Sequence, residues 1–216
     1  LFAHQIMELN KINSLVELFF KKYEEISRNS DQQFLNWLKE SEKKFLTWGE
    51  VEIKVKALSE YLKIGISKGD RCVLLSENRP EWLIADLAIM NAGGVTVPLF
   101  TTYSEKDYEY IIKDCEPKIC IVSNDIQLQK IKKFVSEKIK ILSIDNIRNE
   151  IENIESIFLR YEKKASLEAR SNFNQEIHRE DLACIIYTSG TTGNPKGVML
   201  SHGGILSNCE GAQEIL

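Results

Sequence analysis

The spacing of hydrophobic positions near the start of the chain predicts an amphipathic helix. Ser14 and Glu17 form the S-x-x-E pattern of a capping box, which marks the first turn of a helix. The apolar residues that follow recur every three or four positions, as one helix face requires: Leu15, Leu18, Phe19, Tyr23 and Ile26. We therefore expect a helix that buries this face.

A second helix is predicted over residues 48–63, "WGEVEIKVKALSEYLK", because Thr47 and Glu50 repeat the capping-box pattern. Gly65 stands where a C-terminal cap is expected, since glycine readily adopts the left-handed conformation that ends many helices. Short strands are expected to flank residues 34–38. The first 68 residues thus predict a mixed helix and strand region.

From residue 70 the pattern alternates between short apolar runs typical of strands and longer apolar segments typical of helices. The expected strands are "CVLLS" (72–76), "GVTVPLF" (94–100), "KICIVS" (118–123) and "KIKILSI" (138–144). The expected helices are "EWLIADLAIMNA" (81–92), the segment from the Ser104–Asp107 cap to Cys115, and "DIQLQKIKKFVSE" (125–137). This alternation predicts an α/β fold with a mostly parallel sheet and helices on both faces.

The pattern weakens between residues 144 and 179. A set of spaced apolar residues indicates one surface helix among many charges: Ile151, Ile154, Ile157, Phe158 and Tyr161. The polar stretch "EARSNFNQEIHRE" reads as a connector. We divide the chain into residues 10–68, the βαβ region 69–145, the connector 146–179 and a last region 180–216. Because it begins with Leu1 and stops inside an expected helix, we interpret it as part of a larger domain.

Composition and charge narrow the class of protein. The chain has 216 residues, of which 43% are hydrophobic and 28% charged, and its net charge is −4, which is typical of a globular protein without a general affinity for nucleic acid. The five cysteines are scattered without a C-x-x-C pair, so no zinc site is predicted. The most apolar window, "WLIADLAIMNAGGVTVPLF", is interrupted by polar residues and predicts no membrane span. We expect a cytoplasmic protein. A peripheral contact with a membrane stays open, because the sequence does not reveal one.

The segment "YTSGTTGNPKGVMLSH", residues 187–202, carries the clearest candidate chemistry. It lies between two expected strands, "LACIIY" and "GVMLS", and therefore predicts a loop and not the start of a helix. It fits neither the P-loop pattern G-x-x-x-x-G-K-[ST] nor the dinucleotide-binding pattern G-x-G-x-x-G. Its glycines allow the backbone N–H groups to turn toward one point, while its hydroxyls and its lysine add donors for an anion. The candidate ligands of a polyphosphate are Thr188, Ser189, Gly190, Thr191, Thr192, Gly193 and Lys196. The simpler alternative is a solvated turn.

The stretch "YTSGTTGNPKGV" resembles the phosphate-binding signature of the adenylate-forming superfamily, which includes acyl-CoA synthetases, luciferases and the adenylation domains of peptide synthetases. "LTWGEV", the run from "KGDRCVLLSENRPEW" to "VPLFTTYS", and "KICIVS" are similar, in the same order, to the N-terminal region of long-chain fatty-acid CoA ligases. The resemblance covers residues 10–216.

This resemblance implies an activity for the complete enzyme. A fatty acid carboxylate would attack the α-phosphorus of ATP, in the presence of Mg²⁺, to give an acyl-adenylate and pyrophosphate, and the thiol of coenzyme A would then displace AMP. The loop from Thr188 to Lys196 would hold the β- and γ-phosphates. The later motifs of the family, its catalytic lysine and its C-terminal domain would lie beyond residue 216. We therefore expect no catalytic residue in this stretch and no adenylation by it alone.

Other candidate residues are interpreted as structural. His202 has no acid or nucleophile at triad-like spacing, so an anchoring role is expected. The "ENRPEW" segment is treated as scaffold, the cysteines as small buried hydrophobes, and the lysine run "KIKKFVSEKIK" as a solvated helix face. Two alternatives to a fatty-acid CoA ligase stay open: a peptide-synthetase type of adenylation domain, and a non-catalytic nucleotide-binding module.

Overall fold

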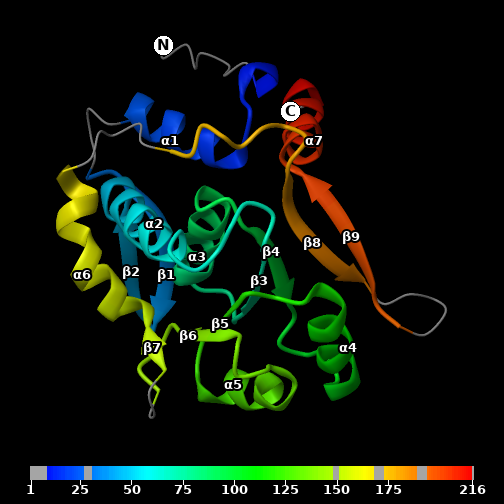
Figure 1. The fold of residues 1–216 in the computed structure, drawn as a ribbon. Coiled ribbons are helices and arrows are strands. Elements are labelled where there is room, and N and C mark those ends of the chain that lie inside the picture. Colours follow the sequence, from blue (N-terminus) through cyan, green and yellow to red (C-terminus); the bar gives the residue numbers. More distant parts are fainter. Residues whose placement is uncertain (1–8, 27–30, 148–150, 168–172, 189–193, 216) are drawn as a thin grey trace.

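The fold was analysed in a computed structural model, which describes residues 9–26, 31–147, 151–167, 173–188 and 194–215 (Figure 1). The N-terminal region contains a 3-10 helix η1 (Leu9–Lys11), helix α1 (Leu15–Ile26), strands β1 (Gln33–Lys39) and β2 (Glu42–Thr47), and helix α2 (Trp48–Leu62). The strands β1 and β2 pair antiparallel as a separate two-stranded sheet. The segment 34–38, which was expected to lie between strands, is thus itself part of β1.

A seven-stranded sheet forms the centre of the fold. Its strands are β3 (Arg71–Leu75), β4 (Val95–Leu99), β5 (Ile119–Val122), β6 (Lys140–Ser143), β7 (Glu152–Asn153), β8 (Leu182–Thr188) and β9 (Lys196–Ser201). They lie in the order β7-β6-β5-β3-β4-β8-β9. All neighbours are parallel except β8 and β9, which are antiparallel. The predicted α/β class and mostly parallel sheet are confirmed.

Helices cover both faces of the sheet, as Figure 1 shows. The remaining helices are α3 (Pro80–Asn91), α4 (Glu105–Cys115), α5 (Asp125–Ile131), the 3-10 helix η3 (Lys132–Phe134), α6 (Ile154–Leu167) and α7 (His202–Ile215). Alternate residues of β3 point to opposite faces: Leu74 packs in the cluster beneath α2, α3 and α6, whereas Val73 packs in the cluster beneath α4 and α5. Burial on both faces explains why these strands are continuous apolar runs.

The predicted caps account for where several helices begin. Thr47 accepts a hydrogen bond from the Glu50 amide, and the Glu50 carboxylate accepts one from the Thr47 amide at 2.7 Å. Ser104 and Asp107 form the same reciprocal pair at the start of α4. Gly65 was wrongly expected to be a left-handed cap, because α2 ends in a right-handed turn in which the Gly65 amide donates to the Leu62 carbonyl at 2.9 Å.

Two further features differ from the expected pattern. Helix α5 ends at Ile131 and continues only as η3, so the expected helix over 125–137 is shorter than predicted. Strand β7 was not predicted, because two residues carry too little pattern to be recognised. The expected surface helix is α6, whose apolar residues Ile154, Ile157 and Phe158 are buried against α2.

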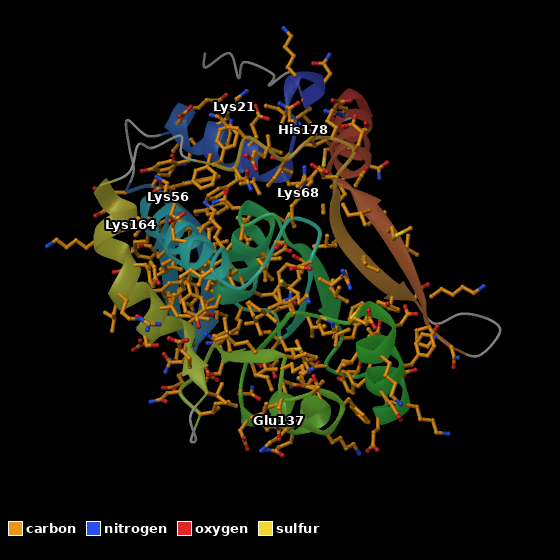
Figure 2. The ribbon with its side chains drawn as sticks, in the orientation of Figure 1. Lys21, Lys56, Lys68, Glu137, Lys164 and His178 are labelled. Atoms are coloured by element: carbon orange, nitrogen blue, oxygen red, sulfur yellow. The ribbon has the colours of Figure 1, made fainter. Side chains whose placement is uncertain are left out.

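The layer between α1 and α2 contains a buried ion pair. Lys56, labelled in Figure 2, is 2% exposed and its ammonium lies 2.5 Å from the Glu52 carboxylate one helical turn earlier. The same ammonium lies 5.9 Å from the centre of the Phe20 ring of α1. A charge that is so deeply buried requires such a partner, because an unpaired buried charge costs several kcal/mol.

We expect Gly94→Ala to destabilise the fold by about 1–3 kcal/mol, because an added methyl group overpacks the junction between α3 and β4. A Cβ at Gly94 would lie 2.9 Å from Ile66 Cδ1 and 3.2 Å from the Ile89 carbonyl oxygen. The matched control is Gly211→Ala in α7, where a Cβ meets nothing within 4 Å and the higher helix propensity of alanine stabilises by up to about 1 kcal/mol. Urea denaturation measures both, and equal effects of the two variants would contradict the packing argument.

Candidate functional site

The candidate loop lies at the carboxyl edge of the parallel sheet. Strand β8 runs parallel to β4, with Cys184 opposite Thr96, so its last residue, Thr188, reaches the edge at which the parallel strands end. Strand β9 returns antiparallel, with Lys196 directly opposite Thr188. This confirms the prediction that two strands flank the loop. Ligands of open α/β sheets bind at this edge.

The structure places two of the seven predicted site residues. Thr188 and Lys196 are both exposed, and they face each other as the last ladder pair of the β8–β9 hairpin. Among the described residues, none forms a hydrogen bond or an ion pair with the Lys196 ammonium. The residue before Lys196 is the buried Pro195. Ser189, Gly190, Thr191, Thr192 and Gly193 lie outside the described residues. Their role as phosphate ligands stays a prediction.

Gly197, which follows the lysine, is required by packing across the hairpin. A Cβ at this position would lie 2.9 Å from Ile185 Cγ2 and 3.1 Å from Tyr187 Cζ on the facing strand. The Tyr187 ring, 2% exposed, therefore rests against the backbone next to Lys196. A close strand approach thus explains the glycine of the "PKG" sequence, which the motif alone did not reveal.

A cleft of about 510 Å³ opens beside the hairpin at the same edge. Its apolar walls include Trp82 of α3, Pro98 and Phe100 at the end of β4, and Ile186 of β8. The Phe100 side chain is 61% exposed, although the residue is large and apolar. The cleft could not be predicted from the sequence, because its residues are far apart in the chain. The available signal was the position of "ENRPEW" and "LFTTY" just after two strands.

The "ENRPEW" segment is held in place by charged hydrogen bonds. The Glu77 carboxylate, which lines the cleft, accepts hydrogen bonds from the side-chain amides of Gln127 at 2.7 Å and Asn124 at 3.3 Å. Burial acts to raise the pKa of Glu77, but the hydrogen bonds that its carboxylate accepts outweigh burial and lower the pKa to about 2. Arg79 bridges Glu81 at 2.8 Å and Asp145 at 2.9 Å. These contacts join the loops that follow β3, β5 and β6, and they support the scaffold interpretation.

His202 anchors the start of α7, as predicted. Its Nδ1 accepts a hydrogen bond from the Leu15 amide at 3.2 Å, and the residue is 1% exposed. Burial lowers the pKa of His202 to about 4, so the imidazole is neutral near pH 7. Arg179 strengthens the same junction by donating to the carbonyl oxygens of Leu9 at 2.9 Å and Ile12 at 2.7 Å. The N-terminal segment is thereby attached to the element that follows the hairpin.

The amino edge of the sheet carries ion pairs of its own. Lys68, labelled with His178 in Figure 2, donates to the Asp181 carboxylate and the Glu176 carbonyl, both at 2.7 Å. Asp181 also accepts from the His178 amide at 2.7 Å. Hydrogen bonds and the ammonium of Lys68 hold the pKa of Asp181 below its usual value despite some burial. These contacts hold the connector that leads into β8.

The cysteines were expected to be small buried residues. Four of them are buried, namely Cys72, Cys115, Cys120 and Cys184, whereas Cys209 is exposed and contradicts that expectation. Burial raises the pKa of Cys72 to about 12, so this thiol stays protonated.

Within the described residues, no group of three or more His, Cys, Asp or Glu side chains is arranged to hold a metal ion. Nor does any helix in the described part have the length and apolar character needed to cross a membrane.

The comparison with protein families matches residues 23–215 to the family described as AMP-binding enzyme. The chain is 30% identical over 207 residues to fatty acyl-CoA synthetase A of Dictyostelium discoideum, a match that covers 87% of this chain and 30% of that protein. It is 31% identical to long-chain-fatty-acid–CoA ligase ACSBG2 of Xenopus laevis, covering 90% and 26%. The chain thus spans less than a third of the length of these relatives.

Solved structures share the fold. The structure of VinN with 3-methylaspartate superposes with a TM-score of 0.75 at 21% identity, covering 94% of this chain and 52% of that one. The fatty acyl-adenylate ligase from L. pneumophila, solved with acyl adenylate and pyrophosphate, superposes with a TM-score of 0.69 at 27% identity, covering 94% and 33%.

Protonation of His202 is expected to destabilise the fold as the pH falls. The pKa of about 4 in the folded state lies below the ordinary value of 6.5, so stability is complete above pH 6.5 and is lost progressively down to about pH 4. At pH 5 the loss is about 2 kcal/mol relative to pH 7. Urea denaturation at both pH values, compared between the wild type and the His202 variant, isolates this loss, because Asp86, whose pKa is raised by burial to about 6, also titrates in this range. The variant His202→Gln, whose amide does not titrate, should show a smaller change, and identical pH dependence in both proteins would contradict this account.

Proposed function

Because the chain belongs to the AMP-binding enzyme family, we propose that it supplies the phosphate-binding wall of an ATP-dependent acyl-CoA synthetase. In the first step the carboxylate oxygen of the acid attacks the α-phosphorus of ATP, and pyrophosphate leaves. In the second step the sulfur of coenzyme A attacks the carbonyl carbon of the acyl-adenylate, and AMP leaves. Because the chain spans less than a third of its curated relatives, the proposal concerns the full-length protein.

The observation that carries this proposal is the position of Lys196. The register of the hairpin sets Lys196 opposite Thr188 at the carboxyl edge of the sheet, and the described residues provide no counter-ion for its ammonium. Negative charge develops on the leaving pyrophosphate as the bond to the α-phosphorus breaks. A lysine beside loop hydroxyls and backbone N–H groups stabilises that charge, and each such donor typically lowers the barrier by a few kcal/mol. We assign the residues between 188 and 196 to the β- and γ-phosphates.

The proposed co-substrates are coenzyme A and a fatty acid, and Mg²⁺ would enter with the phosphates of ATP. Such a metal needs few protein ligands, because phosphate oxygens and water supply most of its coordination. The apolar walls of the cleft, including Trp82 and Phe100, support a substrate with an apolar part. The curated relatives named for fatty acids support the same choice. A long-chain acid is the finer proposal.

Exchange of labelled pyrophosphate into ATP tests the proposed function. The full-length protein is incubated with ATP, Mg²⁺ and one acid at a time: a long-chain fatty acid, acetate, an aromatic acid or an amino acid. We expect exchange that depends on the fatty acid. Exchange that depends on an amino acid would indicate a peptide-synthetase type of domain instead. Tight ATP binding without exchange for any acid would indicate a non-catalytic nucleotide-binding module.

Lys196→Ala should slow adenylation about 10- to 100-fold in the full-length protein, since a hydrogen bond to a charged group is worth roughly 1.5–3 kcal/mol. Thiolysis of a supplied acyl-adenylate should be unchanged, because pyrophosphate has already left. Rapid-quench measurement of each half-reaction separates the two steps. Lys196→Arg keeps the positive charge and serves as the matched variant. Equal damage to both half-reactions would show that the lysine does not act on the leaving group.

Acyl chain length should strongly affect turnover if the acid is a fatty acid. Burial of each added methylene contributes about 0.8 kcal/mol, so kcat/KM should rise several-fold per CH₂ until the acyl site is filled. The measurement is CoA thioester formation by the full-length protein with a series of fatty acids. If acetate is the better substrate, the long-chain assignment is wrong while the adenylation chemistry stands.

A further inference from the structure

On the side that faces β4, the end of β8 is held by side chains, while β9 pairs with its other side. The described ladder between β4 and β8 contains one pair, Thr96 with Cys184, whereas β8 continues for four more residues. Beyond that pair, the Tyr103 hydroxyl donates to the Tyr187 carbonyl oxygen at 2.6 Å. The Tyr187 hydroxyl in turn donates to the Asp114 carboxylate of α4 at 2.5 Å. Two hydrogen bonds thus fix the residue that precedes Thr188.

Tyr187 transmits this restraint to both ends of the candidate loop. Its backbone continues into Thr188, and its buried ring packs against Gly197, the residue after Lys196. Burial, together with the Asp114 carboxylate, raises the pKa of Tyr187, so its hydroxyl stays protonated and remains a donor. A shift of this ring would therefore move the two strand ends together.

Tyr103 is itself firmly placed. Its ring makes edge contacts with Phe100, at 5.3 Å between centroids, and with Tyr108, at 6.1 Å. The Tyr108 hydroxyl donates to the Phe100 carbonyl at 2.8 Å, and the Lys130 ammonium donates to the Thr101 carbonyl at 2.7 Å. The loop between β4 and α4 is therefore a fixed support from which Tyr103 reaches β8.

We propose that Tyr103 and Asp114 are positioning residues, which act through Tyr187 to hold the strand ends so that the loop between Thr188 and Lys196 meets the phosphates of ATP. This inference rests on the proposed function and names residues that the family signature does not contain. Charged donors stabilise a transition state only when they are accurately placed, and a small displacement removes much of this stabilisation. A residue that holds the loop in place therefore affects the rate of adenylation. Neither Tyr103 nor Asp114 lines the cleft.

The experiment compares variants of the full-length protein that remove one hydrogen bond each. Tyr187→Phe keeps the ring against Gly197 and loses the hydroxyl, Tyr103→Phe loses the other donor, and Asp114→Ala loses the acceptor. Asp114→Asn keeps an oxygen acceptor and is the conservative variant. Two controls lie on the same helix: Tyr110→Phe, whose hydroxyl has no hydrogen bond among the described residues, and Glu109→Ala, which removes an exposed carboxylate paired with Lys113 at 2.6 Å.

Two readouts are measured on each variant. Loss of the bond between Tyr187 and the charged Asp114 carboxylate should lower kcat/KM of adenylation about tenfold, and loss of the neutral bond between Tyr103 and the Tyr187 carbonyl should lower it by a few-fold. Thiolysis of a supplied acyl-adenylate should not change. Hydrogen exchange at backbone amides 185–188 and 196–199 should become faster in the three variants and stay slow in Asp114→Asn and in both controls.

The outcomes separate the two proposals. If the wild-type protein does not exchange labelled pyrophosphate into ATP with any of the acids, the proposed function fails. Hydrogen exchange at the backbone amides then decides the positioning role by itself. Unchanged amide exchange in Tyr187→Phe and Asp114→Ala would overturn the positioning role, whatever the wild-type activity. So would an equal loss in both half-reactions, since that result indicates general damage to the fold.

Discussion

The antiparallel pairing of β8 with β9 is the constraint on which the candidate site depends. Every other neighbouring pair in the central sheet is parallel. A parallel connection after β8 would take the chain back to the amino edge of the sheet, so the next strand would begin far from Thr188. The hairpin instead brings Lys196 back beside Thr188 at the edge where ligands bind. It also requires a residue without a side chain at Gly197, because Tyr187 occupies the space across the strand.

The rest of the fold fixes this hairpin from two sides. On one side, the loops after β3, β4, β5 and β6 are joined by the hydrogen bonds of Glu77, Arg79 and Lys130, so the carboxyl edge is rigid beneath the cleft. On the other side, His202 and Arg179 attach the amino-terminal segment to the start of α7, directly after β9. The central strands β3, β4 and β5 are buried on both faces, and this burial supplies most of the driving force for folding.

Local signals explain why so much of the fold could be predicted from the sequence. The capping boxes at Thr47 and Ser104 and the apolar runs of the parallel strands depend on residues that are close in the chain. Gly65 was misread, because the cap conformation depends on how the chain leaves the helix and not on the presence of glycine. The loop itself was recognised from its composition and its family signature, and its phosphate contacts stay a prediction.

The features that the sequence did not reveal are those made by distant residues. The hydrogen bond from Tyr103 to Tyr187 spans 84 positions, and that from Tyr187 to Asp114 spans 73. The cleft joins Trp82 of α3, Phe100 just after β4 and Ile186 of β8. No periodic pattern records which loops meet at a sheet edge, because this depends on strand order. The order became clear only with the three-dimensional structure.

The central claim is that the loop between Thr188 and Lys196 receives the terminal phosphates of ATP. A crystal structure of the full-length protein with Mg²⁺ and an ATP analogue that resists cleavage at the α-phosphorus tests it most directly. The account predicts the β- and γ-phosphates within hydrogen-bonding distance of this loop, with the Lys196 ammonium beside them. Phosphates bound elsewhere, for example in the basic groove beside Arg71, Lys118 and Lys138 at the amino edge, would contradict it.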